Sequence, residues 1–152
     1  MTMTTETEIN DFDLSQLEST DEGVLAIKDA KGKATGWLWT FYGPGHPKTV
    51  AVANRAAKRM LDEARDKEKA QVNGKKWQPD EESFAELQKR NVRNIVDRLK
   101  TFTPVKLNGE RIEFSPDKAA ELLLDPRMGK LLGQVQAYLQ AEESFTQPSA
   151  SS

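Results

Sequence analysis

The sequence predicts an α+β fold that is rich in helix, with two β-hairpins packed against about four α-helices. Two pairs of short β-branched and aromatic runs each surround a turn sequence, first DAKGK and later LNGE. Four longer segments repeat apolar residues at helical spacing. Strands and helices do not alternate in the βαβ order that is typical of dinucleotide-binding folds. These observations favour hairpins covered by helices.

Length and composition indicate one domain. A chain of 152 residues can remove roughly 70% of its unfolded surface from water without a disulfide or a metal. We expect this domain at residues 11–145. We expect disordered tails at residues 1–10 and 146–152, because MTMTTETEIN and TQPSASS offer too little apolar surface to offset the entropy of ordering.

The first hairpin is predicted over residues 23–42. Gly32 supplies the positive φ that a short loop needs, and Trp37, Trp39 and Phe41 share one face of the second strand because side chains alternate along a strand. The preceding segment, DFDLSQLEST, places Phe12, Leu14 and Leu17 so that it packs either as an extended arm or as one helical turn. The sequence leaves both alternatives open.

Two long helices are predicted next, at about residues 48–72 and 80–102. The first carries a thin, alanine-rich apolar stripe at helical spacing, formed by Val50, Ala53, Ala57, Met60, Leu61 and Ala64. The second is predicted to bury a broader face, formed by Phe84, Leu87, Val92, Ile95, Val96 and Leu99. Most basic side chains of the first helix lie off its stripe.

The second hairpin and two further helices complete the predicted fold. Asn108-Gly109 is the dipeptide that a type I′ turn favours, and a two-residue loop places Val105 opposite Ile112. Ser115-Pro116 has the features of a helix start, and Asp125-Pro126 ends that helix. The last helix, from residue 126 to about 143, aligns Met128, Leu131, Leu132, Val135, Tyr138 and Leu139.

Most residue patterns that carry chemistry are absent from the sequence. The chain has no cysteine and one histidine, which excludes thiolate nucleophiles, CxxC zinc sites and two-histidine metal sites. His46 has no serine or cysteine in its local stretch, and we interpret it as a turn residue. No phosphate-binding loop or nucleophile elbow occurs, and no run of about 18 apolar residues predicts a membrane span. We therefore predict no enzyme activity and no catalytic, cofactor-binding or metal site.

Two apolar sets are candidate partner-binding surfaces, and each is also explained by the core. The first is Trp37, Trp39 and Phe41, because large aromatic side chains must be covered either by the same chain or by another protein. The second consists of Met128, Leu131, Leu132, Val135 and Leu139. A third surface, with Arg55, Arg59 and Lys75, has the charge for nucleic acid, but interleaved acidic residues make this partner less favoured.

Several strings of residues resemble a known family. YGPGHPKTVAVANRAAKR, AQVNGKKW, TPVKLNGE, FSPDKAAELLLDPRMGKLL and ESFTQPSAS are similar to small proteins encoded among the tail genes of tailed bacteriophages, the tail assembly chaperone family. The resemblance covers about residues 11–149. The chain departs from the family pattern at Lys130, where an aromatic residue is expected.

The resemblance implies a non-enzymatic role in the cytoplasm of the infected bacterial host. Such a chaperone binds the phage tape measure protein, keeps its apolar stripes from aggregating and helps to recruit tail tube protein, with self-association as a further expectation. Two alternatives stay open. One is a small tail or head-tail connector protein of the virion, and the other is a nucleic-acid-binding phage regulator.

Overall fold

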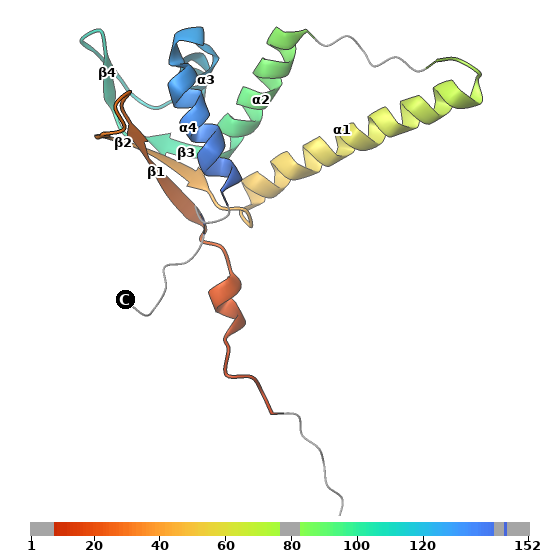
Figure 1. The fold of residues 1–152 in the computed structure, drawn as a ribbon, viewed down its shortest axis with the longest axis horizontal. Coiled ribbons are helices and arrows are strands. Elements are labelled where there is room, and N and C mark those ends of the chain that lie inside the picture. The colour runs from red at the N-terminus through yellow and green to blue at the C-terminus, as the bar shows by residue number, and fades with distance from the viewer. Residues whose placement is uncertain (1–7, 77–82, 142–144, 146–152) are drawn as a thin grey trace, which may run out of the picture.

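The computed structural model describes residues 8–76, 83–141 and 145. Within these residues it contains a three-stranded sheet, a separate two-stranded sheet and four α-helices, which confirms the predicted α+β class (Figure 1). Residues 8–10 have no regular secondary structure. The rest of the two predicted tails, residues 1–7 and 146–152, lies outside the described residues, as do Asp80 and Glu143, the predicted ends of two helices.

The first hairpin forms as predicted and gains a third strand. β1 (Glu22–Lys28) pairs antiparallel with β2 (Ala34–Tyr42), and Gly32 in the loop has a φ of 84°. On its other edge β2 pairs with β3 (Leu99–Phe102), which sets Trp39 opposite Phe102. The order β1-β2-β3 therefore excludes the second hairpin from this sheet.

The predicted helix over residues 80–102 is wrong at its C-terminal end. Helix α2 (Phe84–Arg98) stops at Arg98, and the next four residues are β3. The apolar spacing of this segment fits a helix, but pairing with the exposed edge of β2 satisfies its backbone groups and buries Leu99 and Phe102. The predicted buried face is also too long, because Phe84 is 77% exposed and Leu87 is 36% exposed.

The second hairpin has the predicted register. β4 (Val105–Leu107) pairs with β5 (Glu110–Ile112), with Val105 opposite Ile112 and Leu107 opposite Glu110. Asn108 and Gly109 both have positive φ, at 50° and 82°, as a type I′ turn requires. A local turn thus sets the register of these strands.

Of the remaining helices, α3 begins at its predicted cap, whereas α1 is capped by a residue that the sequence suggested only as a turn residue. Helix α1 (Pro47–Val72) is capped by His46 and helix α3 (Pro116–Leu124) by Ser115, whose hydroxyl accepts a hydrogen bond from the Lys118 amide. A short 3-10 turn, η2 (Pro126–Met128), leads into helix α4 (Gly129–Gln140), so the last helix begins three residues later than predicted. Asp125 caps η2 by accepting from the Arg127 amide.

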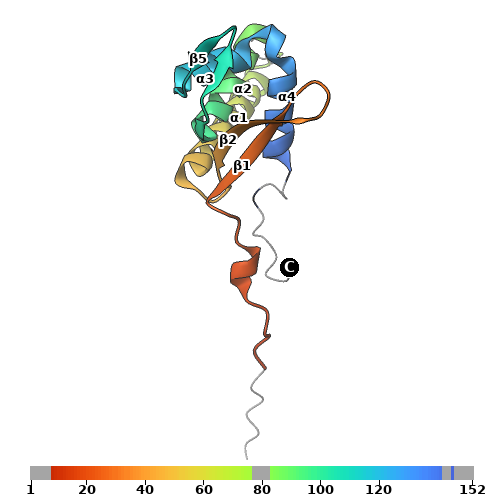
Figure 2. The ribbon, with the colours of Figure 1, turned by 90° about the vertical axis from the view of Figure 1, so that its left-hand side faces the viewer.

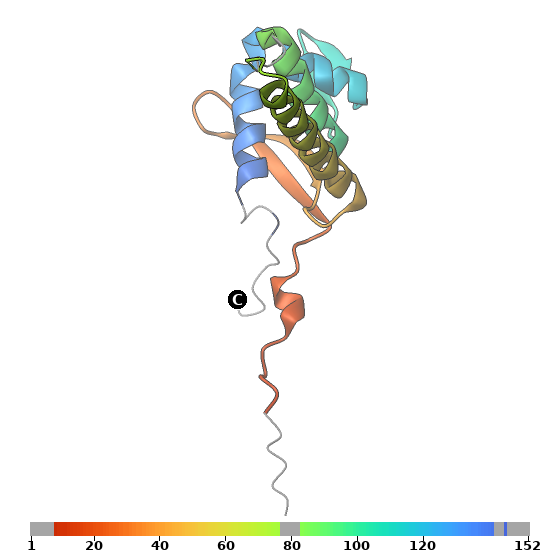
Figure 3. The same ribbon diagram turned by 90° about the vertical axis from the view of Figure 1, so that its right-hand side faces the viewer.

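The core lies between the aromatic face of the sheet and the helices α2, α3 and α4 (Figures 2 and 3). Trp39 and Phe41 are completely buried there, and Phe102 stacks on Trp39 with ring centroids 5.1 Å apart. The fully or nearly fully buried aliphatic partners from the helices are Val92, Ala119, Leu123 and Val135. Most of α1 contributes nothing to this core, since Thr49 is its only buried residue.

Two glycine positions should respond oppositely to alanine. At Gly109, alanine would have to adopt a left-handed backbone, so we expect Gly109→Ala to lower the free energy of unfolding by about 1–2 kcal/mol. Gly133 lies in α4, and a methyl group there would meet nothing within 4 Å. We expect Gly133→Ala to raise the free energy of unfolding by about 0.5–1 kcal/mol, because alanine favours helix. Urea denaturation measures both, and equal effects would contradict the assigned turn.

Candidate partner-binding surface

The aromatic stripe of β2 is part of the core. Trp39 and Phe41 expose none of their surface, and only Trp37 is partly exposed. The indole of Trp37 donates to the Thr103 carbonyl at 2.8 Å and packs edge-on against the Trp39 ring at 5.3 Å. In this conformation the stripe joins the sheet to the helices and offers little area to another protein.

The apolar stripe of α4 is also turned inward. Leu131 is 6% exposed and Val135 is completely buried. The other three residues of this set, Met128, Leu132 and Leu139, are partly buried and pack against the same core. Neither apolar set that the sequence suggested for partner binding is therefore an open surface in this structure.

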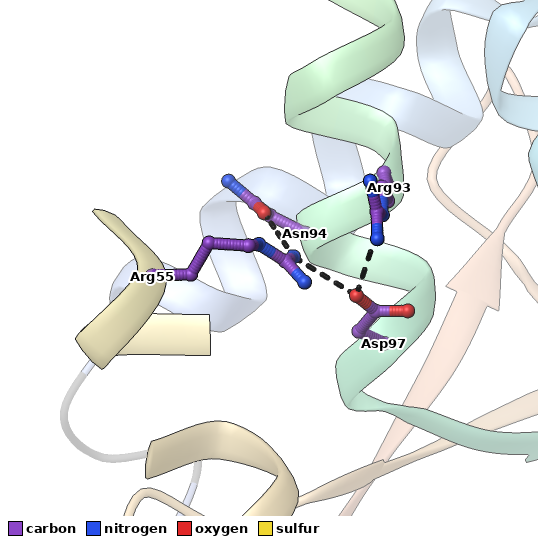
Figure 4. A network of polar contacts seen from close by, with 4 residues as sticks. All are labelled: Arg55, Arg93, Asn94 and Asp97. Carbon is purple, nitrogen blue, oxygen red and sulfur yellow. Dashed lines mark hydrogen bonds and ion pairs between the residues drawn. The ribbon is translucent and has the colours of Figure 1, made fainter. Parts of the chain in front are cut away.

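The first turns of helix α1 attach it to the domain. The hydroxyl of Thr49 donates to the Tyr42 carbonyl at 3.3 Å. Two turns later, Arg55 bridges to α2 by donating to Asn94 at 2.5 Å and to Asp97 at 2.9 Å (Figure 4). Arg93 lies 4.0 Å from the same Asp97 carboxylate. Beyond this network α1 and α2 diverge (Figure 1).

The apolar side of α1 is left uncovered. The α1 apolar stripe, which we define as Val50, Ala53, Ala57, Met60, Leu61 and Ala64, is exposed along its whole length. Its largest members are Met60, 72% exposed, and Leu61, 60% exposed. Because a helix repeats every 3.6 residues, Val50, Ala57 and Leu61 lie on the side opposite Arg55 and therefore opposite α2.

A covering partner explains such a helix better than the fold does. Helices in proteins gain most of their stability by packing an apolar face against other elements, and contiguous apolar residues on a surface commonly mark interaction sites. The small alanine side chains at positions 53, 57 and 64 allow another helix to approach the α1 backbone closely. The larger side chains of Met60 and Leu61 supply apolar contact area. Methionine adapts its shape to differing partners. The geometry suits an amphipathic helix laid along α1.

A second uncovered segment precedes the domain. We call residues 8–18 the acidic arm; it contains a 3-10 turn, η1 (Leu14–Leu17), in which Asp13 accepts from the Ser15 amide at 2.9 Å. This hydrogen bond to Ser15 lowers the pKa of the Asp13 carboxyl below its usual value. The arm matches the helical-turn alternative of the sequence, yet it does not pack. Its large apolar side chains are between 48% and 93% exposed, and they are Ile9, Phe12, Leu14 and Leu17.

An open groove of about 1010 Å³ separates α1 from α2. Its walls carry six basic side chains, which are Arg55, Lys58, Arg59, Lys89, Arg90 and Arg93. Three acidic side chains lie among them, Asp62, Glu63 and Asp66. Arg59 lies 3.5 Å from Glu63, so part of the charge is paired within α1. Sequence spacing predicted basic residues beside the stripe, but only the crossing of α1 with α2 shows that they face one another.

No family model, curated protein or solved structure matches this chain. The resemblance to tail assembly chaperones therefore depends on the quoted residues alone. The exposed surfaces are the evidence that remains for function.

The single histidine of the chain caps a helix. The Nδ1 atom of His46 accepts from the Lys48 amide at 3.1 Å, and its ring stacks on Tyr42 at 4.1 Å, so the histidine is a helix cap. Within residues 8–76, 83–141 and 145, no group of three or more metal-ligating side chains gathers. The helices in that part of the chain also lack a segment long and apolar enough to cross a membrane.

The three basic residues that the sequence suggested for binding nucleic acid do not form one patch. Arg55 is held by Asn94 and Asp97, and Arg59 lies beside Glu63, whereas Lys75 is exposed after the end of α1. Trp77, which would stack on a base in that hypothesis, lies outside the described residues. The structure thus brings together Arg55 and Arg59 but does not add Lys75 to them.

Proposed function

We propose that this protein is a non-enzymatic tail assembly chaperone of a tailed bacteriophage. In this proposal the α1 apolar stripe binds amphipathic helices of the tape measure protein and shields them from aggregation, while the domain presents them to tail tube protein. Several copies along one long partner would add their individually modest contacts. The proposed contact residues replace the β2 and α4 sets, which are engaged in the core.

The exposure of the α1 apolar stripe is the observation that carries this proposal. Helix α1 has 26 residues, yet only Thr49 is buried in the domain. Charged residues alone keep an exposed helix soluble, so solubility does not require an apolar stripe of alanine, methionine and leucine. A surface that binds another helix does require such a stripe. No packing within the described part of the chain covers the stripe, which supports a partner as its function.

Co-expression with the tape measure protein of the same phage tests the proposal. We expect the wild-type chain to co-purify with it and to keep it soluble. In the double variant Met60→Glu and Leu61→Lys, which leaves the net charge unchanged, we expect capture to fall on the order of tenfold or more, because each change removes about a kilocalorie or more of apolar contact. Both side chains are exposed, so the fold should persist in circular dichroism.

A matched control makes the same chemical changes elsewhere. Leu14→Glu with Leu17→Lys replaces two side chains that are each 73% exposed and lie outside α1. We expect this control to retain capture. Equal capture by wild type and the α1 double variant would refute the stripe as the site. Stable incorporation of the chain into purified virions would instead favour the connector alternative.

A further inference from the structure

Basic side chains border the α1 apolar stripe along one edge. We call Lys58, Arg65 and Lys69 the basic row; its members follow one another at intervals of seven and four residues and are all exposed. Because successive residues of an α-helix turn by about 100°, the row occupies a band about 40° wide beside Leu61. The row therefore lies next to the surface that a partner helix on the stripe would cover.

The charges of the basic row are not neutralised within the described part of the chain. Among those residues, no ion pair or hydrogen bond involves a side chain of the row. Arg65 and Lys69 stand four residues apart on the helix, a spacing at which two like charges destabilise it. Asp62 and Asp66 lie behind the row, where they line the groove between α1 and α2 together with basic side chains of α2. An acidic group on a partner would offset this unfavourable row.

The opposite edge of the stripe is balanced in charge. It carries one acidic and one basic residue, Glu63 and Lys67. The Glu63 carboxylate lies 3.5 Å from Arg59, so its charge is paired within α1. The positive excess beside the stripe is therefore confined to the edge that carries the basic row.

We propose that the partner helix carries acidic residues along one edge of its own apolar face, where they pair with the basic row. This inference rests on the proposed function, because it names the charge of the helix that the α1 apolar stripe would bind. Acids seven residues apart on the partner match Lys58 and Arg65, since seven residues rise about 10.5 Å in either helix. Burial of the stripe supplies affinity, and the charge pairs select among apolar helices.

Binding of matched synthetic helical peptides to the full chain tests this inference. The peptides share one seam of leucine and alanine and differ only along one edge, which carries glutamate, lysine or glutamine. In fluorescence anisotropy at low salt we expect the glutamate peptide to bind on the order of tenfold tighter than the lysine peptide. The difference should shrink near 1 M salt, where the Debye length is about 3 Å. The net charge of −2 favours the lysine peptide, so the overall field of the chain does not produce this preference.

Reversal of the charge of the basic row supplies the critical comparison. In the double variant Arg65→Glu with Lys69→Glu we expect the preference to invert, so that the lysine peptide binds more tightly than the glutamate peptide. Tight binding of the lysine peptide would also show that the variant keeps its helix. The control Lys106→Glu with Lys130→Glu makes the same change in net charge at two exposed residues outside α1 and should keep the wild-type preference.

The possible outcomes separate this inference from the proposed function. Equal binding of all peptides by the wild type would overturn the role of the basic row and leave the α1 apolar stripe as a binding site. So would a charge-reversed variant that keeps the wild-type preference. If no peptide binds the wild type, the stripe is not a helix-binding surface, and both proposals are overturned.

Discussion

Trp39→Ser is expected to lower the free energy of unfolding by about 3–5 kcal/mol, as replacing a large buried aromatic residue does in other cores. The side chain is completely buried and its ring packs against Trp37, Phe41 and Phe102. Serine would leave a cavity among these rings and would place a hydroxyl in it. A loss of this size is a large part of the stability of an ordinary domain, so much of the variant should be unfolded at 37 °C.

A second substitution at the same position supplies the comparison. The indole Nε1 of Trp39 is buried without a hydrogen-bond partner among the described residues. Trp39→Phe keeps most of the ring and removes this unpaired donor, so we expect a change within about 1.5 kcal/mol. Urea denaturation followed by circular dichroism measures both variants without relying on tryptophan fluorescence. A stable Trp39→Ser variant that had lost partner binding would instead make β2 a contact surface.

Local signals in the sequence were sufficient for several elements. The Asn108-Gly109 turn sets the register of β4 and β5 because both residues must adopt positive φ. Ser115 and Pro116 identify the start of α3, since a cap needs only its own neighbouring amides. Such features depend on a few adjacent residues and are therefore visible in one chain.

Elements that depend on distant pairing could not be predicted in this way. The residues of β3 continue the helical spacing of Ile95 and Val96, and only the free edge of β2 makes them a strand. The same limit applies to the candidate surface. The spacing of the α1 apolar stripe was visible, but the sequence does not show that α2 lies on the side of α1 away from Val50, Ala57 and Leu61, with Met60 at the edge of the groove between the two helices. It also gave no sign that Phe145, at the end of a polar segment, is buried.

Phe145→Ala is expected to cost about 3–5 kcal/mol of stability although the residue lies only seven positions before the last residue of the sequence. Phe145 is 3% exposed, packs edge-on against Tyr138 at 5.5 Å and lies beneath the Arg98 guanidinium at 5.5 Å. Burial of this guanidinium lowers the pKa of Arg98 below its usual value. Removing the ring would open this packing to water and would leave a cavity beside Gly23, where an added methyl would contact the ring at 2.7 Å.

The exposed Phe84 provides the matched control for this change. Phe84→Ala removes the same atoms from a side chain that is 77% exposed, so we expect a change within about 0.5 kcal/mol. Phe145 also fixes the base of the acidic arm, because the Thr20 amide donates to its carbonyl at 2.8 Å. Loss of the ring should loosen that hydrogen bond, and amide hydrogen exchange at Thr20 should become faster in Phe145→Ala than in Phe84→Ala. Equal stability of the two variants would show that the C-terminal segment does not pack on the sheet.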